Sequence, residues 1–258
     1  ARDALDSRIS MEEARALTAQ GVGKVYWHAG TLKPEGDGWR LVGDLETPSS
    51  RLATLGLIPV LRLTAEGAAP LGEVAERSLE RAMLEAARRA GADEVQIDFD
   101  CPDRRLSEYA ALLGKCRARI APLRLSATAL AGWSRLPAFE QLQGSVDLLM
   151  PMFYDLMPDP PARVLAGQVL PLIDADTVAK QLESWRGCRV PWHAGIPNFA
   201  RVTVFNRAGK SRGHLRAWDW DAVCFNPALM LHGQPTPGAT MLRADREDEV
   251  MKAIARLR

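Results

Sequence analysis

The sequence contains little cysteine and no surplus of charge of either sign. Its four cysteines in 258 residues are too few for a disulfide scaffold, and no two of them form the Cys-x-x-Cys pair that is typical of zinc sites. The 33 Lys and Arg residues nearly balance the 32 Asp and Glu residues, which leaves a formal net charge of +1. We therefore expect no nucleic-acid partner, because such partners select strongly basic surfaces.

Long apolar runs and the common nucleotide-binding motifs are also missing. No run approaches the roughly 20 apolar residues of a membrane-spanning helix, so no transmembrane segment is expected. The phosphate-binding patterns GxGxxG and GxxxxGK[ST] and the zinc-protease pattern HExxH do not occur. No spacing of His, Cys, Asp or Glu calls for a metal ion, and we expect no cofactor and no metal.

The start of the sequence bears on the compartment. The chain begins at Ala1, and its first methionine is Met11. A removed targeting segment and a shortened chain would both explain this start, and we expect an exported protein, periplasmic or extracellular. In an oxidising compartment the four cysteines allow three pairings, and free thiols are the alternative.

Short β-rich runs alternate with amphipathic helical stretches, an order that is typical of βα units around a parallel sheet. The clearest helix spans 71–90, with Val74, Leu79, Met83 and Ala87 along one stripe and Gly91 after its end. Further helices are predicted at 11–20, 104–119, 175–186 and 245–257, strands at 24–29, 58–64, 94–100, 123–130, 146–154, 189–196, 222–226 and 240–243, and hairpins at 33–47 and from 202 to beyond 213.

A closed (β/α)8 barrel explains this order better than an open doubly wound sheet, because no glycine-rich phosphate turn follows an early strand. The sequence thus predicts an α/β fold, a TIM-like barrel with hairpin insertions that is allowed to be irregular or incomplete at its first strand. No linker long enough to separate domains is present, and we expect a single domain over residues 1–258. The oligomeric state stays open.

An acidic strand carries the strongest functional signal. In the run 94–100 (EVQIDFD), Gln96, Asp98 and Asp100 project to one side, because strand residues two apart share a face. The apolar residues between them would face covering helices, so the acids are expected inside the barrel near its carboxyl-end mouth. Two carboxylates this close disfavour joint ionisation, which predicts a raised pKa for one of them and a general-acid role. The alternative is structural, with Asp98 paired to an Arg and Asp100 capping the next helix.

These residues also carry a resemblance to a known family. The run 93–102 (DEVQIDFDCP) resembles the DxxDxDxE strand of family-18 glycoside hydrolases, the chitinase-like barrels, with Asp98 as the third acid and Asp100 in the place of the proton-donating Glu. The run 152–155 (MFYD) is similar to that family's M-x-Y-D strand. This resemblance implies that Tyr154 assists the reacting acetamido group and that Asp155 lines the subsite. The run 195–199 (GIPNF) is similar to the family's G-x-P-x-[YF] strand end.

A longer likeness covers most of the chain. The runs VQIDFDCP, LSATALAGW and VDLLMPMFYDL resemble a bacterial family known as domain of unknown function 3142, which implies a barrel and no particular activity. The chain departs from the family-18 pattern at three places, one of which is the last barrel strand, where 223–226 (VCFN) holds no counterpart of that family's Trp. Asp100 is one methylene shorter than Glu, and Gln96 stands where the second Asp belongs, so a barrel that has lost catalysis is an alternative.

Aromatic, histidine and arginine side chains recur where the predicted strands end. Flat rings suit the apolar faces of sugars, and a His can donate hydrogen bonds to sugar hydroxyls. An inward Arg62 would need an acid, with Asp98 or Asp100 nearest, and such a pair would lower the pKa of that acid. For each residue, packing or structural pairing is the alternative, and for Trp185 we expect packing alone. The candidate substrate-binding residues are Trp27, His28, Arg62, Gln96, Trp133, Trp192, His193 and Phe199.

Together these patterns predict a glycoside hydrolase that acts on a poly- or oligosaccharide by carboxylate general acid/base chemistry. Its catalytic residues would be Asp98, Asp100, Tyr154 and Asp155, and its partner would be a carbohydrate. The alternatives are a carbohydrate-binding barrel without catalysis and an accessory scaffold of an envelope or export system. The sugar and the linkage stay open.

Overall fold

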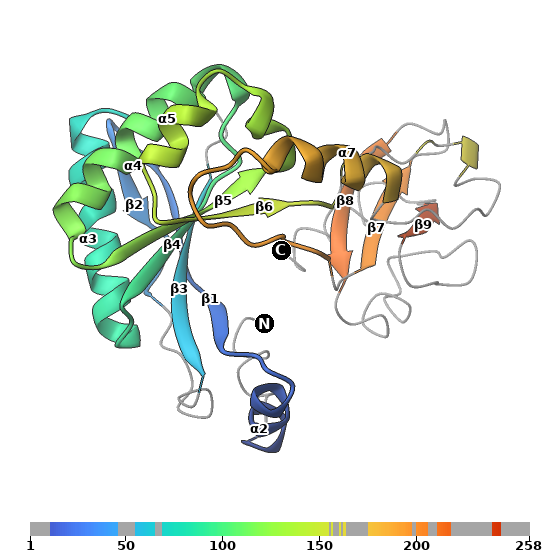
Figure 1. Cartoon of the computed structure of the whole chain (residues 1–258), viewed down its shortest axis with the longest axis horizontal. Coiled ribbons are helices and arrows are strands. Elements are labelled where there is room, and N and C mark those ends of the chain that lie inside the picture. Colours follow the sequence, from blue (N-terminus) through green and yellow to red (C-terminus); the bar gives the residue numbers. More distant parts are fainter. Residues whose placement is uncertain are drawn as a thin grey trace. The chain divides into compact units, whose positions relative to one another are not determined.

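The computed structural model describes residues 11–45, 55–64, 69–154, 156, 160, 162–163 and 175–197, and the strands at 200–205, 211–217 and 239–243 (Figure 1). The chain divides into two compact units. The first comprises Ala1–Met152 and Glu183–Ala194, and the second comprises Phe153–Leu182 and Gly195–Arg258. The single domain over 1–258 stays a prediction, and the units are described separately below.

The first unit is built on a mostly parallel sheet with the strand order β2-β1-β3-β4-β5-β6. All neighbouring strands run parallel except β2, which pairs antiparallel with the end of β1 in the expected hairpin. Trp192 forms a parallel bridge with Leu149 of β6, and Gly195 is a second bridge residue, so the predicted strand 189–196 is reduced to isolated bridges. The strands are β1 Lys24–Glu35, β2 Gly38–Leu41, β3 Gly56–Leu63, β4 Glu94–Asp98, β5 Arg124–Leu130 and β6 Leu148–Met152.

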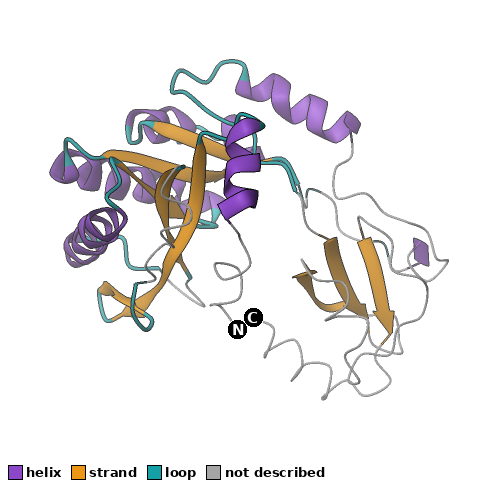
Figure 2. Cartoon of the chain, turned by 90° about the horizontal axis from the view of Figure 1, so that it is seen from below, coloured by secondary structure: helices purple, strands orange, loops and turns teal. Residues whose placement is uncertain are grey.

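Helices alternate with these strands, and α3, α4 and α5 lie side by side against the sheet (Figure 1). This alternation confirms the predicted α/β, TIM-like architecture, in an incomplete form within the described residues. Figure 2 shows the same helices in purple along the orange strands. The helices are α2 Met11–Ala19, α3 Glu73–Ala90, α4 Leu106–Ile120 and α5 Phe139–Gly144, with short 3-10 helices η2 Asp103–Arg105 and η3 Ala131–Arg135. A further helix, α7 Ala175–Trp185, belongs to the second unit up to Leu182.

Helix α3 shows how the apolar pattern positions an element. Leu79, Met83 and Ala87 are buried against the sheet, as predicted. Gly91 ends the helix in the left-handed conformation, at φ 61°, and its backbone N–H donates to Ala87 O and Arg88 O. Val74 is the exception, because its side chain is 57% exposed. The buried stripe is therefore rotated away from Val74.

The second unit contains a three-stranded sheet of order β8-β7-β9. The antiparallel pair β7 Ala200–Phe205 and β8 Ser211–Ala217 confirms the second predicted hairpin, and β9 Ala239–Arg243 runs parallel to β7. The strand predicted at 222–226 and the helix predicted at 245–257 lie outside the described residues. Within the described ranges, no helix combines the length and the apolar character needed to cross a membrane.

Candidate active site at the carboxyl ends of β3, β4 and β5

Strand β4 organises the polar side chains of the sheet into three levels. Val95 and Ile97 project to the face that the helices cover and are fully buried. Glu94, Gln96 and Asp98 project to the opposite face, where Glu94 and Gln96 are also buried. The strand register pairs Arg124 with Glu94, Ser126 with Gln96 and Arg62 with Asp98. The three levels therefore run from the amino ends of the strands, at Glu94, to their carboxyl ends, at Asp98.

The lowest level is a buried ionic cluster around Glu94, whose side chain is only 1% exposed. Lys24 Nζ donates to Glu94 Oε2 at 2.9 Å, and the Tyr26 hydroxyl donates to Oε1 at 3.2 Å. Arg124 Nη1 lies 3.9 Å from Oε2. Burial and the nearby carboxylate raise the pKa of Tyr26 well above its usual range, so Tyr26 remains a donor. At the amino ends of barrel strands such a cluster serves stability.

The middle level contains neutral polar groups. Gln96 is 2% exposed and its amide Nε2 lies 4.0 Å from Met150 Sδ. Ser126 is fully buried and its hydroxyl donates to Val95 O at 3.4 Å. This burial favours a supporting role for Gln96 over the direct substrate contact suggested by its position in the sequence.

The upper level brings both candidate acids to one guanidinium. Arg62 Nη1 lies 3.5 Å from Asp98 Oδ2, and Arg62 Nη2 lies 3.9 Å from Asp100 Oδ2. The Thr128 hydroxyl donates to the other carboxylate oxygen of Asp98 at 2.9 Å. The side chains of Asp98, Arg62 and Asp100 are 22%, 43% and 60% exposed, in that order. The expected pairing of Arg62 with an acid is thus confirmed, and it involves both acids.

These contacts give the two carboxylates different chemical characters. Asp98 is held through both oxygens, so its orientation is fixed by neighbouring strands. Asp100 follows the end of β4 and is the more accessible acid. A fixed carboxylate beside an accessible one, at the carboxyl ends of parallel strands, is the arrangement from which barrel enzymes build acid/base chemistry.

An aromatic cluster holds the backbone between the two acids. Phe99 is buried, and its ring meets the ring of Tyr109 edge-on at a centroid distance of 5.3 Å and that of Trp39 at 6.0 Å. Burial raises the pKa of Tyr109 well above its usual range. Because Phe99 separates Asp98 from Asp100, these contacts fix the segment from which both carboxylates project.

The other residues singled out in the sequence occupy more varied positions. Trp27 packs against the cluster of Ala14 and Leu55 rather than projecting with the acids. The His28 Nε2 atom lies 3.1 Å from Thr31 Oγ1, next to β3. Trp133 is 1% exposed and packs edge-on against Tyr109, which suits the packing alternative and not a sugar platform.

The remaining singled-out residues follow β6 in the chain. Trp192 is half-buried, with its ring centroid 5.7 Å from that of Trp185, and His193 is exposed while its backbone N–H donates to Leu149 O. Trp185 is fully buried and its indole N–H donates to Ala131 O, which confirms its expected packing role. Tyr154 belongs to the second unit and is half-buried. Asp155 and Phe199 lie outside the described residues.

Two polar residues of this face were not singled out in the sequence. Thr128 contacts Asp98, and Glu94 anchors the lowest level. Alternation along 94–100 and 124–130 would have placed both on the inner face. Their partners on other strands depend on register. Among the described residues, no three His, Cys, Asp or Glu side chains are arranged to hold a metal ion.

The sheet, its helices and the polar levels define a TIM-like α/β protein with an acidic pair at the carboxyl ends of its strands. The chain belongs to the family described as Domain of unknown function (DUF3142), whose model matches residues 56–212. The resemblance noted in the sequence is thereby confirmed. No curated protein matches the chain.

Two of the solved structures that match the chain illustrate the fold. The spore cortex-lytic enzyme SleL of Bacillus cereus is 14% identical with a TM-score of 0.55, over 87% of this chain and 56% of that chain. A chitinase from Bacteroides thetaiotaomicron is 12% identical with a TM-score of 0.51, over 75% of this chain and 63% of that chain. This chain therefore spans less than two thirds of either protein. These likenesses show a chitinase-like barrel fold.

Proposed function

We propose that this protein acts on a poly- or oligosaccharide as a glycoside hydrolase, with Asp98 and Asp100 as its carboxylate pair. The observation that carries the proposal is the meeting of Asp98 and Asp100 at Arg62, at the carboxyl ends of β3 and β4. The fold shared with a spore cortex-lytic enzyme and a chitinase supports a glycan as the substrate. Export belongs to the same proposal, because large polysaccharides lie outside the cell.

The two acids would take different roles. Asp100, the more exposed carboxyl, would donate the proton to the leaving oxygen, because it can approach a bound sugar. Asp98, anchored by Thr128 and Arg62, would stabilise the developing positive charge or act as the nucleophile. His28, Trp192 and His193 are the described candidates for sugar contacts. The roles of Tyr154, Asp155 and Phe199 stay predictions.

A specific observation also favours a second function, carbohydrate binding without hydrolysis. Arg62 reaches both carboxylates, so neither acid stands alone, and charged groups paired in this way are suited to form hydrogen bonds with sugar hydroxyls. The replacement of the family-18 Glu by the shorter Asp100 points the same way. In this alternative, Arg62, Asp98 and Thr128 form hydrogen bonds to sugar hydroxyls.

Reducing-end release from a panel of chitin oligosaccharides, peptidoglycan and neutral polysaccharides tests the proposal. Wild type is compared with Asp100→Asn and with Asp44→Asn, a matched change at an exposed carboxylate between β2 and β3. If the proposal is right, Asp100→Asn loses about 100-fold or more in rate, and Asp44→Asn keeps full activity.

The same panel is tested for binding by affinity electrophoresis. Glycan retention without hydrolysis, equal in wild type and Asp100→Asn, would establish the binding alternative and refute the hydrolase. Arg62→Gln separates the two further, because a binding site that uses the guanidinium loses retention when it is removed. Silence of every glycan in both assays would refute both functions.

A further inference from the structure

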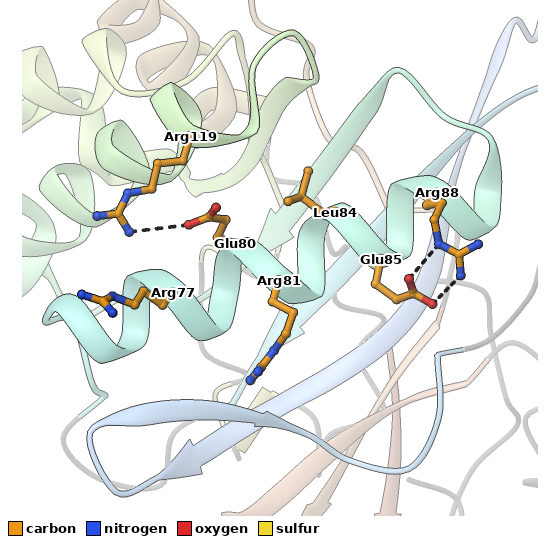
Figure 3. A pocket seen from close by; sticks show the side chains of 7 residues that line it. All are labelled: Arg77, Glu80, Arg81, Leu84, Glu85, Arg88 and Arg119. Carbon is orange, nitrogen blue, oxygen red and sulfur yellow. Dashed lines mark hydrogen bonds and ion pairs between the residues drawn. The ribbon is translucent and has the colours of Figure 1, made fainter.

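A cavity lies on the outer surface of the first unit, and neither Asp98 nor Asp100 lines it. Its volume is about 700 Å³, and it lies over the solvent side of α3 with one residue from α4 (Figure 3). Six of its seven lining residues are charged, and four of these are arginines. The lining residues are Arg77, Glu80, Arg81, Leu84, Glu85, Arg88 and Arg119.

Helix α3 exposes a second, regular stripe opposite its buried one. Val74, Arg77, Arg81, Leu84 and Arg88 are all exposed. Their spacings of three and four residues are those of the a and d positions of a coiled-coil seam. We call these five residues the α3 stripe. They share the side of α3 that faces away from the sheet, because Leu79 and Met83 bury the other side.

The α3 stripe combines apolar anchors with positive charge. Val74 and Leu84 are 57% and 43% exposed, and they belong to the five large hydrophobic residues that are exposed in the described part of the chain. At a rise of about 1.5 Å per residue they lie about 15 Å apart, roughly three turns of a partner helix. Because both lie on one stripe at helical spacing, they can offer a partner helix two apolar contacts on a single face.

The arginines of the stripe differ in how far they are already neutralised. Arg77 pairs with Glu73, and Arg88 Nη2 lies 2.8 Å from Glu85 Oε1. Hydrogen bonds from Arg88 and from Arg89 lower the pKa of Glu85 to about 2, so this carboxylate stays ionised. Arg81, at the centre, makes no ion pair with any residue in the described ranges, and its guanidinium is available to a carboxylate of a partner.

We propose that the α3 stripe binds an acidic amphipathic helix of a partner protein. Apolar residues of that helix would pack on Val74 and Leu84, and its Asp or Glu side chains would pair with Arg81 and its neighbours. A second copy of this chain fits poorly, because pairing two stripes would bring arginines against arginines. A uniform polyanion fits less well than a mixed helix, because Glu80 and Glu85 interrupt the positive charge and two anchors are apolar.

A designed peptide tests this proposal directly. The probe is a synthetic helix of about three heptads. It has Leu at the positions that face Val74 and Leu84, and Glu at those that face the arginines. The control peptide carries Lys in place of each Glu, and inorganic polyphosphate serves as the polyanion. Binding to the full chain is measured by fluorescence anisotropy at about 0.05 M and about 0.5 M NaCl, since salt screens exposed charges.

The expected result is binding of the Glu peptide, no binding of the Lys peptide, and a loss of about 10-fold or more in both Arg81→Glu and Leu84→Ser. Arg15→Glu, the same change at an exposed arginine of α2, should leave the affinity unchanged. Failure of the Glu peptide to bind, or equal binding to Arg81→Glu, would refute the proposal. Polyphosphate binding that ignores Leu84→Ser would show a polyanion site instead. Self-association in sedimentation that Arg81→Glu abolishes would show that the partner is a second copy.

Discussion

The buried cluster around Glu94 predicts that its two ends respond unequally to mutation. Glu94 is 1% exposed, whereas the side chain of its partner Lys24 is 46% exposed. Lys24→Met leaves a buried carboxylate with only Tyr26 and the more distant Arg124 to compensate it. Glu94→Gln leaves a cation that can turn toward water, and the amide can still accept the Tyr26 hydrogen bond. The carboxylate end is therefore the costly one to expose.

The magnitudes follow from these partners. Removing one partner of a buried ion pair costs about 3–5 kcal/mol, and the remaining Tyr26 bond brings Lys24→Met to about 3 kcal/mol. Glu94→Gln exchanges charged hydrogen bonds for a neutral one and should cost about 1 kcal/mol. The double variant should cost far less than the sum of the two, with a coupling of about 2 kcal/mol. Lys33→Met, at an exposed lysine of the same strand, should stay within about 0.5 kcal/mol.

Urea unfolding followed by tryptophan fluorescence measures these differences as shifts of midpoint at constant m-value. The expected order of stability is wild type and Lys33→Met first, then Glu94→Gln and the double variant, then Lys24→Met. Equal losses in Lys24→Met and Glu94→Gln, or strict additivity in the double variant, would show that Glu94 is solvated. The three-level arrangement of the inner face would then be wrong at its base.

Three further predictions concern Tyr109, two cysteines and Asp147 of the first unit. Tyr109→Phe should raise the free energy of unfolding by about 1 kcal/mol, because the buried hydroxyl has no hydrogen-bond partner among the described residues. A loss of stability in urea unfolding would contradict this prediction. Burial raises the pKa of the Cys101 and Cys116 thiols to about 12. At pH 8 a thiol reagent should therefore label these two cysteines about 100-fold more slowly in the native chain than in urea, and equal rates would show that they are accessible. Burial raises the pKa of Asp147, but the hydrogen bonds that its carboxylate accepts from Arg117 and from a backbone N–H of β5 outweigh burial and lower the pKa. The stability that the ionised carboxylate contributes is therefore complete above about pH 4 and is lost as the pH falls through the lowered pKa. The stability deficit of Asp147→Asn, about 1 kcal/mol at pH 7, should therefore shrink toward pH 3 in urea unfolding, and a deficit that does not change with pH would contradict this.

Local patterns in the sequence were sufficient for the elements that bury one continuous face. The helix from Glu73 and the strand from Glu94 lie within two residues of their predicted ranges, because their apolar periodicity is long and uninterrupted. Val74 shows the limit of this method. Its spacing fits a helical stripe, but the packing surface of the sheet is covered by residues on a neighbouring stripe.

Elements whose extent depends on a partner were harder to predict. Strand β1 runs to Glu35 rather than 29, because its second half pairs with β2 in the hairpin. The segment 189–196 alternates like a strand, yet only Trp192 and Gly195 form bridges, each as a single residue. Helix α5, at Phe139–Gly144, was not predicted, because six residues are too few to show a helical period.

The same distinction decides what the sequence can say about the acidic pair. Alternation in 94–100 gives the face on which Asp98 projects, and alternation in 58–64 gives that of Arg62, but neither gives their level along the strands. The level comes from the pairing of β3 with β4, which sets Arg62 directly beside Asp98. A register shifted by two residues toward the amino end of β4 would keep every side chain on its face and would set Arg62 beside Gln96 instead of Asp98. The meeting of the two acids at Arg62, on which the proposed function rests, therefore depends on a tertiary register. Removal of Arg62 tests that register more sharply than removal of either acid.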